Sequence, residues 1–281
     1  MNNLLVTGAN GQLGSEIKLI APNYPQYNFF FTDAEDLDIT KHEIVKDYIK
    51  SHNINIIINC AAYTAVDNAE YEPEISNEIN HLAVSNFAKL AVEFKIKLIH
   101  ISTDYVFDGE NNKPYRETDI TNPQSVYGKT KLDGELALQK INPQNSIIIR
   151  TSWVYSRFGK NFVKTMLQLA ESNNEISVVN DQTGSPTNAA DLSLAILTVI
   201  PQINNKSVKL FHYSNSGSCT WYDFAKAIFE NKQISIKLKS LVSKNYPTKA
   251  SRPKYSVLNS YKFEKEFDIK IRNWKNSLKS F

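Results

Sequence analysis

The first half of the chain alternates short apolar runs with segments in which apolar residues recur at helical spacing. The apolar runs predict strands at Asn3–Thr7, Tyr27–Phe31, Asn55–Cys60, Lys97–Ser102 and Ser146–Arg150. The segments between them predict helices at Gln12–Ile20, Lys41–His52, Glu78–Phe94 and Tyr127–Lys140. Strands that are apolar on both faces and separated by helices form a parallel sheet that is covered on both sides. The pattern therefore predicts a doubly wound α/β fold with right-handed crossovers.

After Arg150 the alternation becomes irregular. Helices are predicted near Asn161–Glu171, Ala189–Val199 and Thr220–Phe229, and strands at Ile176–Val179 and Lys209–Tyr213. We therefore expect a Rossmann-type domain over residues 1–151 and a smaller C-terminal α/β domain formed mainly by residues 152–281. Segments near residues 188–214 are expected to return to the main sheet.

Composition and charge exclude several classes of protein. The chain has 281 residues, of which 42% are apolar and 22% are charged, and these values exclude a disordered chain, collagen and a disulfide scaffold. The net charge of +3 is too small to argue for nucleic acid or an anionic membrane. No apolar run approaches the roughly 18 residues that a membrane span needs, and no basic leader precedes the first run. We expect a cytoplasmic protein.

The cysteines and histidines predict no metal site. Cys60 and Cys219 stand alone and are expected to be free thiols in a reducing compartment. The five histidines form no pair with the spacing of metal ligands.

Residues 7–14 read Thr-Gly-Ala-Asn-Gly-Gln-Leu-Gly, and they follow a predicted strand and open a predicted helix. Gly8 permits a tight turn, Gly11 lets a diphosphate approach the backbone, and Gly14 lets the helix pack on the strand. This context favours a dinucleotide site over a turn that binds no ligand.

An acidic residue after the second strand is expected to bind the adenosine ribose of a dinucleotide. Asp33 has this position, and Asp38 lies nearby. No Lys or Arg occurs between residues 19 and 40 to hold a 2′-phosphate, which favours NADH. NADPH stays open as an alternative, because a cation can come from another segment.

Tyr127 and Lys131 lie at i and i+4, on one face of a predicted helix. This spacing alone would indicate an exposed amphipathic turn. Upstream, however, Ser102, Thr103 and Asp104 follow a predicted strand, at the end of the sheet where open α/β folds bind ligands. A nearby ammonium lowers the pKa of a tyrosine from about 10, so the phenol can act as a general acid. The Thr103 hydroxyl can hold the same substrate oxygen.

These motifs resemble the extended short-chain dehydrogenase/reductases. Within that group, five segments resemble the dTDP-4-dehydrorhamnose reductases: residues 7–14, 59–70, 102–109, 150–155 and 181–187, with a weaker match at 252–258. The resemblance implies NADPH- or NADH-dependent reduction of the C4 ketone of dTDP-4-dehydro-β-L-rhamnose to dTDP-L-rhamnose. It also implies that residues 1–151 bind the cofactor and that the smaller domain mainly binds the substrate.

The resemblance further implies roles for individual residues. Tyr127 is the expected proton donor, Lys131 its activator and a ribose contact, and Thr103 the third member of the set. The expected cofactor-binding residues are Gly8, Asn10, Gly11, Gln12, Leu13, Gly14, Asp33, Asp38, Ile39, Ala61, Ala62, Tyr63, Thr64, Asn80, Tyr127 and Lys131. The expected substrate-binding residues are Val66, Thr103, Asp104, Tyr105 and Trp153. From the residues alone, Trp153 is equally well explained as part of the core.

Some members of this family dimerise through Mg²⁺ held by carboxylates. Here Asn188–Asp191 lacks the glutamate of that pattern, and Asn273–Phe281 contains no acid. We therefore expect no metal and a monomer, with a weak homodimer as the alternative.

Two other functions stay open. The first is reduction or epimerisation of another nucleotide-4-keto-6-deoxysugar, because the pocket segments do not separate stereochemical outcomes. The second is a non-catalytic regulatory role, like that of the β subunit of methionine adenosyltransferase, which resembles the same family. The intact Thr103, Tyr127 and Lys131 set favours an enzyme, since a pure scaffold does not need it.

Overall fold

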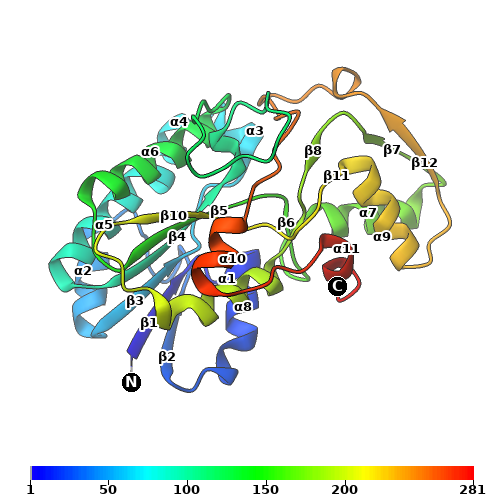
Figure 1. Ribbon diagram of the computed structural model, residues 1–281. Coiled ribbons are helices and arrows are strands. Elements are labelled where there is room, and N and C mark those ends of the chain that lie inside the picture. The colour runs from blue at the N-terminus through cyan, green and yellow to red at the C-terminus, as the bar shows by residue number, and fades with distance from the viewer. Residues whose placement is uncertain (1) are drawn as a thin grey trace.

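A six-stranded parallel sheet forms the centre of the larger lobe in the computed structural model, which describes residues 2–281 (Figure 1). Its strands are β1 (Asn2–Thr7), β2 (Tyr27–Thr32), β3 (Ile54–Asn59), β4 (Lys97–Thr103), β5 (Ser146–Thr151) and β10 (Lys209–His212). They are arranged in the order β10-β5-β4-β3-β1-β2. The predicted doubly wound α/β fold is confirmed. Because β2 and β3 lie on opposite sides of β1, the topology opens a crevice at the carboxyl ends of β1 and β3.

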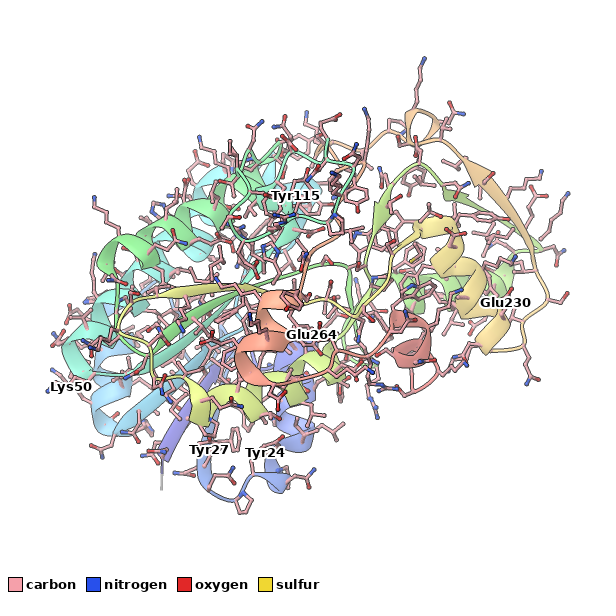
Figure 2. All side chains as sticks on the ribbon, in the orientation of Figure 1. Tyr24, Tyr27, Lys50, Tyr115, Glu230 and Glu264 are labelled. Carbon is pink, nitrogen blue, oxygen red and sulfur yellow. The ribbon has the colours of Figure 1, made fainter. Side chains whose placement is uncertain are left out.

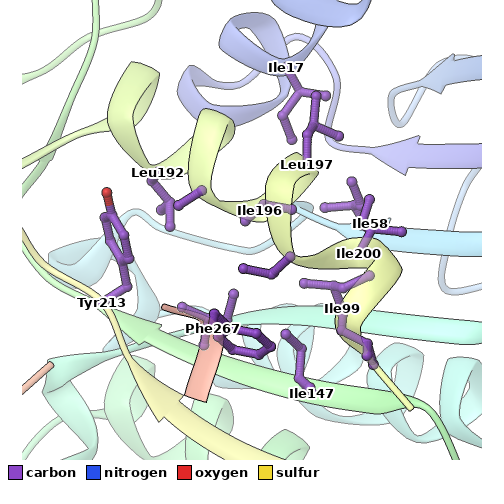
Figure 3. Packing of buried hydrophobic residues seen from close by; sticks show 14 of the residues in the cluster. Ile17, Ile58, Ile99, Ile147, Leu192, Ile196, Leu197, Ile200, Tyr213 and Phe267 are labelled. Carbon is purple, nitrogen blue, oxygen red and sulfur yellow. The ribbon is translucent and has the colours of Figure 1, made fainter. Parts of the chain in front are cut away.

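Three helices pack on each face of this sheet. One face is covered by α1 (Gln12–Ile20), α8 (Ala189–Val199) and α10 (Tyr261–Phe267), and the other by α2 (His42–Ser51), α5 (Ala83–Phe94) and α6 (Val126–Ile141). Figure 3 shows Ile17 of α1 beside Leu197 of α8, and Phe267 of α10 close to Ile147 of β5. The apolar strands therefore have a hydrophobic core on both sides, as their sequence pattern requires.

A second, smaller lobe has its own core. It contains α7 (Phe162–Ser172), α9 (Trp221–Asn231) and α11 (Trp274–Leu278), and a parallel pair made by β7 (Glu175–Val179) and β12 (Lys237–Leu241). Its buried side chains include Tyr155, Val163, Phe224 and Trp274. Figure 2 shows Glu230 on α9 in this lobe and Glu264 on α10 against the main sheet.

Several short elements were not predicted. Two-residue strands pair across the junction of the lobes: β6 (Val154–Tyr155) with β9 (Thr187–Asn188), and β8 (Thr183–Gly184) with β11 (Cys219–Thr220). A strand of two residues is too short to show an alternating pattern, which explains the omission. That the larger lobe binds the cofactor and the smaller lobe mainly the substrate stays a prediction.

The predicted helix Glu78–Phe94 is longer and less regular than expected. Short helices α3 (Val66–Ala69) and α4 (Pro73–Asn77) come first, and a π-helical turn at Glu78–Leu82 joins α4 to α5. Turns of this kind are often found at functional sites. The π-turn contains the buried Asn80, whose contacts are described below.

Three charged or titratable side chains are buried beside the sheet. Glu135 on α6 accepts hydrogen bonds from Arg150 on β5, and the Arg150 Nη1 lies 3.5 Å from Nε2 of His212 on β10. The His212 Nδ1 lies 3.1 Å from the Tyr115 carbonyl, so Nδ1 donates and Nε2 accepts in a neutral ring. Burial and the Arg150 charge lower the pKa of His212 to about 3.

We expect the free energy of unfolding of the His212→Gln variant to depend less on pH than that of the parent chain. The histidine pKa is about 6.5 in the unfolded state and about 3 in the folded state, so between these pH values the unfolded state binds more protons. The free energy of unfolding therefore falls as the pH is lowered from 6.5 toward 3. Removing this histidine reduces the slope by up to about 1.4 kcal/mol per pH unit. Urea unfolding at several pH values from 4 to 7 measures both slopes, and equal slopes would contradict the prediction.

Candidate active site

A cavity of about 840 Å³ opens at the carboxyl ends of the strands, from β1 to β5. It brings together most of the predicted site residues from distant parts of the sequence. Those that line it are Gly8, Asn10, Gly11, Gln12, Leu13, Asp33, Asp38, Ile39, Ala61, Ala62, Thr64, Val66, Thr103, Asp104, Tyr105, Tyr127, Lys131 and Trp153.

The glycine turn forms one wall of this cavity. Gly8 has a φ of +65°, and a Cβ there would lie 2.7 Å from the backbone of Ala61. Gly14 does not line the cavity; a Cβ there would lie 2.4 Å from the Gly8 carbonyl oxygen. A Cβ at Gly11 would approach nothing closer than 3.2 Å. Gly8 therefore lets the turn approach the backbone after β3, and Gly14 lets α1 pack against the turn, whereas Gly11 is the least crowded of the three.

The amino end of α1 fits the diphosphate of a dinucleotide. Gly11 caps this helix without any side-chain hydrogen bond, so the first-turn N–H groups face the cavity without a side-chain acceptor. Two buried oxygens that belong to cavity-lining residues, Oε1 of Gln12 and Oγ1 of Thr151, also have no partner within residues 2–281. Buried polar atoms of this kind normally bind a ligand or water.

The acidic residues after β2 take different roles. Asp33 accepts hydrogen bonds from the backbone N–H of Asn10 and of Ala34, both at 2.8 Å, and so ties the glycine turn to the end of β2. Asp38 accepts from the hydroxyl and the N–H of Thr40, and these bonds lower its pKa. Asp33 and Asp38 both line the cavity, where they make its outer end negative.

Tyr127 and Lys131 lie one helical turn apart on the buried face of α6. Burial raises the pKa of Tyr127 above its ordinary value, and the Thr103 hydroxyl partly opposes this. The Lys131 Nζ donates to the Ile101 carbonyl at 2.6 Å, and burial lowers its pKa to about 8. The expected lowering of the Tyr127 pKa by Lys131 is not found in the chain by itself: burial raises this pKa, and Lys131 is not among the groups that shift it. Tyr127 is a protonated phenol at neutral pH.

Thr103 and Asp104 lie close enough to the Tyr127 phenol to shift its pKa. The Thr103 hydroxyl donates to Oδ1 of Asp104 at 3.0 Å and accepts from the N–H of Tyr105 at 3.2 Å. The other Asp104 oxygen has no partner within the described chain. Burial raises the pKa of Asp104 to about 6, although the hydroxyls of Ser256 and Thr103 lower it. Asp104 is thus a buried carboxyl group that titrates close to neutrality.

Aromatic side chains shape the inner end of the cavity. The Tyr105 ring packs edge-on against Tyr127 with centroids 5.5 Å apart, and the Arg252 guanidinium donates to its hydroxyl. Trp153 has a φ of +48°, which is unusual for a bulky residue, and stacks on Trp221 at 3.5 Å. A Cβ at Gly184 would lie 2.4 Å from the Trp153 indole. Gly184 is therefore the residue that makes room for this ring.

Three predicted residues do not line the cavity: Gly14, Tyr63 and Asn80. Asn80 accepts from the Tyr63 N–H at 2.9 Å and donates to the Tyr63 carbonyl at 3.1 Å. Its amide therefore holds the backbone that follows β3, next to Ala62 and Thr64. The Tyr63 hydroxyl donates to Glu72 and is directed elsewhere.

The sequence analysis missed several residues at or behind the site. Lys160 lines the cavity beside Gly159, whose Cβ position lies 3.1 Å from the Gln12 side chain. Behind the cavity lie Glu135 and Arg150, both fully buried. Two signals were available in the sequence: Glu135 continues the i, i+4 series from Tyr127, and Arg150 is a charge at the end of an apolar strand.

The family model described as the RmlD substrate binding domain matches residues 1–281. The chain belongs to this family. The dTDP-4-dehydrorhamnose reductase of Sinorhizobium fredii is 42% identical over 282 residues, which cover 98% of this chain and 94% of that relative.

Two solved structures agree with the RmlD family assignment. A dTDP-4-dehydrorhamnose reductase from Clostridium acetobutylicum has a TM-score of 0.93 and 43% identity, over 99% of this chain and 98% of that one. The enzyme of the same name from Bacillus anthracis, in complex with NADP, has a TM-score of 0.94 and 36% identity, over 100% of this chain and 99% of that one. The predicted resemblance is confirmed.

Asp191, in the segment where the resemblance led us to look for metal ligands, is engaged by contacts within the protein. Asp191 accepts from Arg272 at 3.0 Å and from Asn215 at 2.8 Å, and also from the Ser277 hydroxyl. No group of three His, Cys, Asp or Glu side chains that could hold a metal is found within residues 2–281. Over the same residues, no helix is both long and apolar enough to cross a bilayer.

We expect the Gly14→Ala and Gly11→Ala variants to fail in different ways. Gly14→Ala lowers the free energy of unfolding by about 1–3 kcal/mol, because its Cβ overlaps the Gly8 carbonyl and Ala9. Gly11→Ala changes it by less than about 1 kcal/mol, because the nearest atom to its Cβ lies 3.2 Å away and is a single carbonyl oxygen. It weakens NADPH and NADH binding at least tenfold, roughly 1.4 kcal/mol, because Gly11 lines the cavity where the diphosphate is expected. Urea unfolding and fluorescence titration measure the two effects; normal cofactor binding by Gly11→Ala would refute this reading of the turn.

Proposed function

We propose that this protein reduces the C4 ketone of dTDP-4-dehydro-β-L-rhamnose to dTDP-L-rhamnose, with NADPH or NADH as reductant. The observation that supports this most strongly is one cavity that joins an open glycine turn to a buried Thr103, Tyr127 and Lys131 set. Full-length similarity to dTDP-4-dehydrorhamnose reductases supports the choice of sugar.

In this reaction Tyr127 donates a proton to the C4 oxygen. Its phenol is suited to this because burial keeps it protonated at neutral pH. Lys131, with a pKa of about 8, is largely an ammonium at neutral pH and stabilises the phenolate that the proton transfer leaves. The Thr103 hydroxyl, beside the phenol, turns its hydrogen from Asp104 to the same oxygen as charge develops on that oxygen. A bound nicotinamide cofactor supplies hydride to the carbonyl carbon.

We assign the cofactor and the sugar to different parts of the cavity. The first-turn N–H groups of α1, with Gly11, Gln12 and Leu13, bind the cofactor diphosphate, and Asp33 binds the adenosine ribose. Ala61, Ala62 and Thr64 flank the cofactor, and Asp38 and Ile39 lie beside its adenine. Val66, Asp104, Tyr105 and Trp153 contact the sugar. Residues 1–151, with the segments near 188–214, thus form the cofactor-binding part, and residues 152–281 mainly the substrate-binding part.

We further propose that the chain is a monomer and needs no metal for assembly, although a weak homodimer is the alternative. The engagement of Asp191 by Arg272 within one chain supports this. Two free thiols, Cys60 and Cys219, support the expected cytoplasmic location.

A coupled assay tests the proposal. dTDP-4-dehydro-6-deoxyglucose is supplied with a 3,5-epimerase, cofactor oxidation is followed at 340 nm, and the product is identified by NMR. Turnover that requires the epimerase and yields dTDP-L-rhamnose supports the assignment. Turnover without the epimerase would indicate another 4-keto-6-deoxysugar reductase. No turnover from a folded, cofactor-binding protein would refute the rhamnose assignment and leave first other 4-keto sugars, and then a regulatory role, as the functions to test.

We expect Tyr127→Phe to separate catalysis from binding. Removing the phenolic proton donor lowers kcat/KM by about 10²–10⁴-fold, whereas the ring and its contact with Tyr105 remain. The Kd for NADPH and NADH stays within about threefold of the parent value, which is a change in binding free energy of less than roughly 0.7 kcal/mol. Steady-state kinetics and fluorescence titration measure the two quantities, and unchanged kcat/KM would remove Tyr127 from the mechanism.

We expect Asp33→Asn to shift the cofactor preference toward NADPH. The Asp33 carboxylate lines the cavity and repels a 2′-phosphate, so its neutral replacement raises the NADPH to NADH ratio of kcat/KM by about tenfold. Asp36→Asn is the matched control, because Asp36 is exposed and does not line the cavity. An equal change in both variants would show a general charge effect rather than a ribose contact.

A further inference from the structure

A buried polar network lies directly behind Lys131. Arg150 donates to Glu135 from Nε, at 2.9 and 3.1 Å, and from Nη2 at 2.6 Å. Ser102 donates to the same carboxylate at 2.5 Å. All three residues are at most 3% exposed. The carboxylate is therefore clamped between the ends of β4 and β5, and it leaves α6 little freedom to rotate.

Glu135 is also one helical turn beyond Lys131, which is one turn beyond Tyr127. The three side chains form a row on the buried face of α6, from the cavity inward. Lys131 is 1% exposed and its only hydrogen-bond acceptor within the described chain is the Ile101 carbonyl. Burial lowers the pKa of an ammonium group and favours loss of its proton at neutral pH. A nearby negative charge is therefore needed to keep Lys131 protonated.

The other titratable groups around Lys131 do not supply negative charge. Burial raises the pKa of the Cys60 thiol, after β3, to about 12, and lowers the pKa of His100 on β4 well below its ordinary value. Tyr127, on α6 itself, is likewise a neutral phenol. Arg150 on β5 brings a positive charge, which is paired with Glu135, and His212 on β10 lies beside its guanidinium. Glu135, one helical turn from Lys131 on α6, is the anion among these neighbours; burial lowers the pKa of Lys131, and the charge of Glu135 is the largest effect that raises it.

We propose that Glu135 is a positioning residue for the reaction: its buried carboxylate, clamped by Arg150 and Ser102, keeps Lys131 charged and directed at the cavity. Glu135 does not line the cavity and acts only through Lys131. This inference rests on the proposed function, because the charge of Lys131 matters only if Tyr127 transfers a proton. Its physical content, however, can be measured on the chain without substrate.

The test is a titration of Lys131 by ¹³C NMR, in the full chain labelled at lysine Cε. Loss of the signal in Lys131→Met assigns it. We expect the pKa of Lys131 to fall by about one pH unit or more in Glu135→Gln, the usual size for the loss of a close opposite charge. Glu135→Asp retains the charge and should keep the pKa near the parent value. Asp133→Asn is the matched control, since Asp133 lies on α6 with its side chain partly exposed, and it should leave the pKa within about 0.2 pH units.

Glu135→Gln leaves Arg150 buried without its partner, which threatens folding. The double variant Glu135→Gln/Arg150→Met removes both charges and should show the same fall in the Lys131 pKa. An unchanged pKa in the neutral variants would overturn the inference. If neither neutral variant folds, Glu135 has a structural role only, and the inference is equally overturned.

Activity separates this inference from the proposed function. In the coupled assay, kcat/KM of the parent should decline above pH 8, where Lys131 loses its proton, and this decline should begin at lower pH in the neutral variants. A parent chain with no reductase activity refutes the proposed function, whatever the NMR titration shows. An active parent whose alkaline limb does not move in the neutral variants refutes the role of Glu135 alone.

Discussion

The buried ion pair between Glu135 and Arg150 is the interaction on which the arrangement of the site depends. It joins α6, which carries Tyr127 and Lys131, to β5, whose carboxyl end forms the floor of the cavity. Removing one partner of such a pair typically costs about 3–5 kcal/mol, whereas replacing both by apolar residues is often neutral. The pair is therefore better understood as fixing the orientation of α6 than as a source of net stability.

A second constraint acts at the other end of the cavity. The backbone of Gly14 on α1 approaches that of Gly8 so closely that no side chain fits between them. This approach brings the amino end of α1 to the crevice between β1 and β3, where its free N–H groups can meet a diphosphate. The Trp153 indole, held by Trp221 in a left-handed backbone conformation, limits the cavity on the side of the smaller lobe. The site is thus defined by close packing at both ends and by buried charge in the middle.

Much of this could be predicted from the sequence because the signals are local. Apolar strands such as Asn55–Cys60 are long enough to show their pattern, and the glycine turn and the Tyr127–Lys131 spacing are contained within eight residues or fewer. The pairing of β6 with β9 was not predictable, since two-residue strands carry no periodicity. Asn80 was predicted at the cofactor from the resemblance, and its side chain binds the Tyr63 backbone. Its direction depends on the π-helical turn around it, which sequence spacing does not reveal.

The same limit explains the error on Tyr127. The sequence places an ammonium one turn away, and this predicts a lower pKa for the phenol. It does not show how completely the Tyr127 side chain is removed from water, and this burial raises the pKa of the phenol. Arg150 and Glu135 are far less conspicuous in the sequence than Tyr127 and Lys131, because their importance comes from tertiary contact between α6 and β5.

The central claim is that hydride and proton meet at one carbonyl group in this cavity. The most direct test uses a nicotinamide cofactor that carries deuterium at the transferable position, with the product analysed by NMR. The account predicts one deuterium per product molecule, bound to C4 of the sugar, with the hydroxyl proton coming from Tyr127 and ultimately from solvent. Deuterium at any other carbon, or a reduced sugar that contains none, would contradict the account.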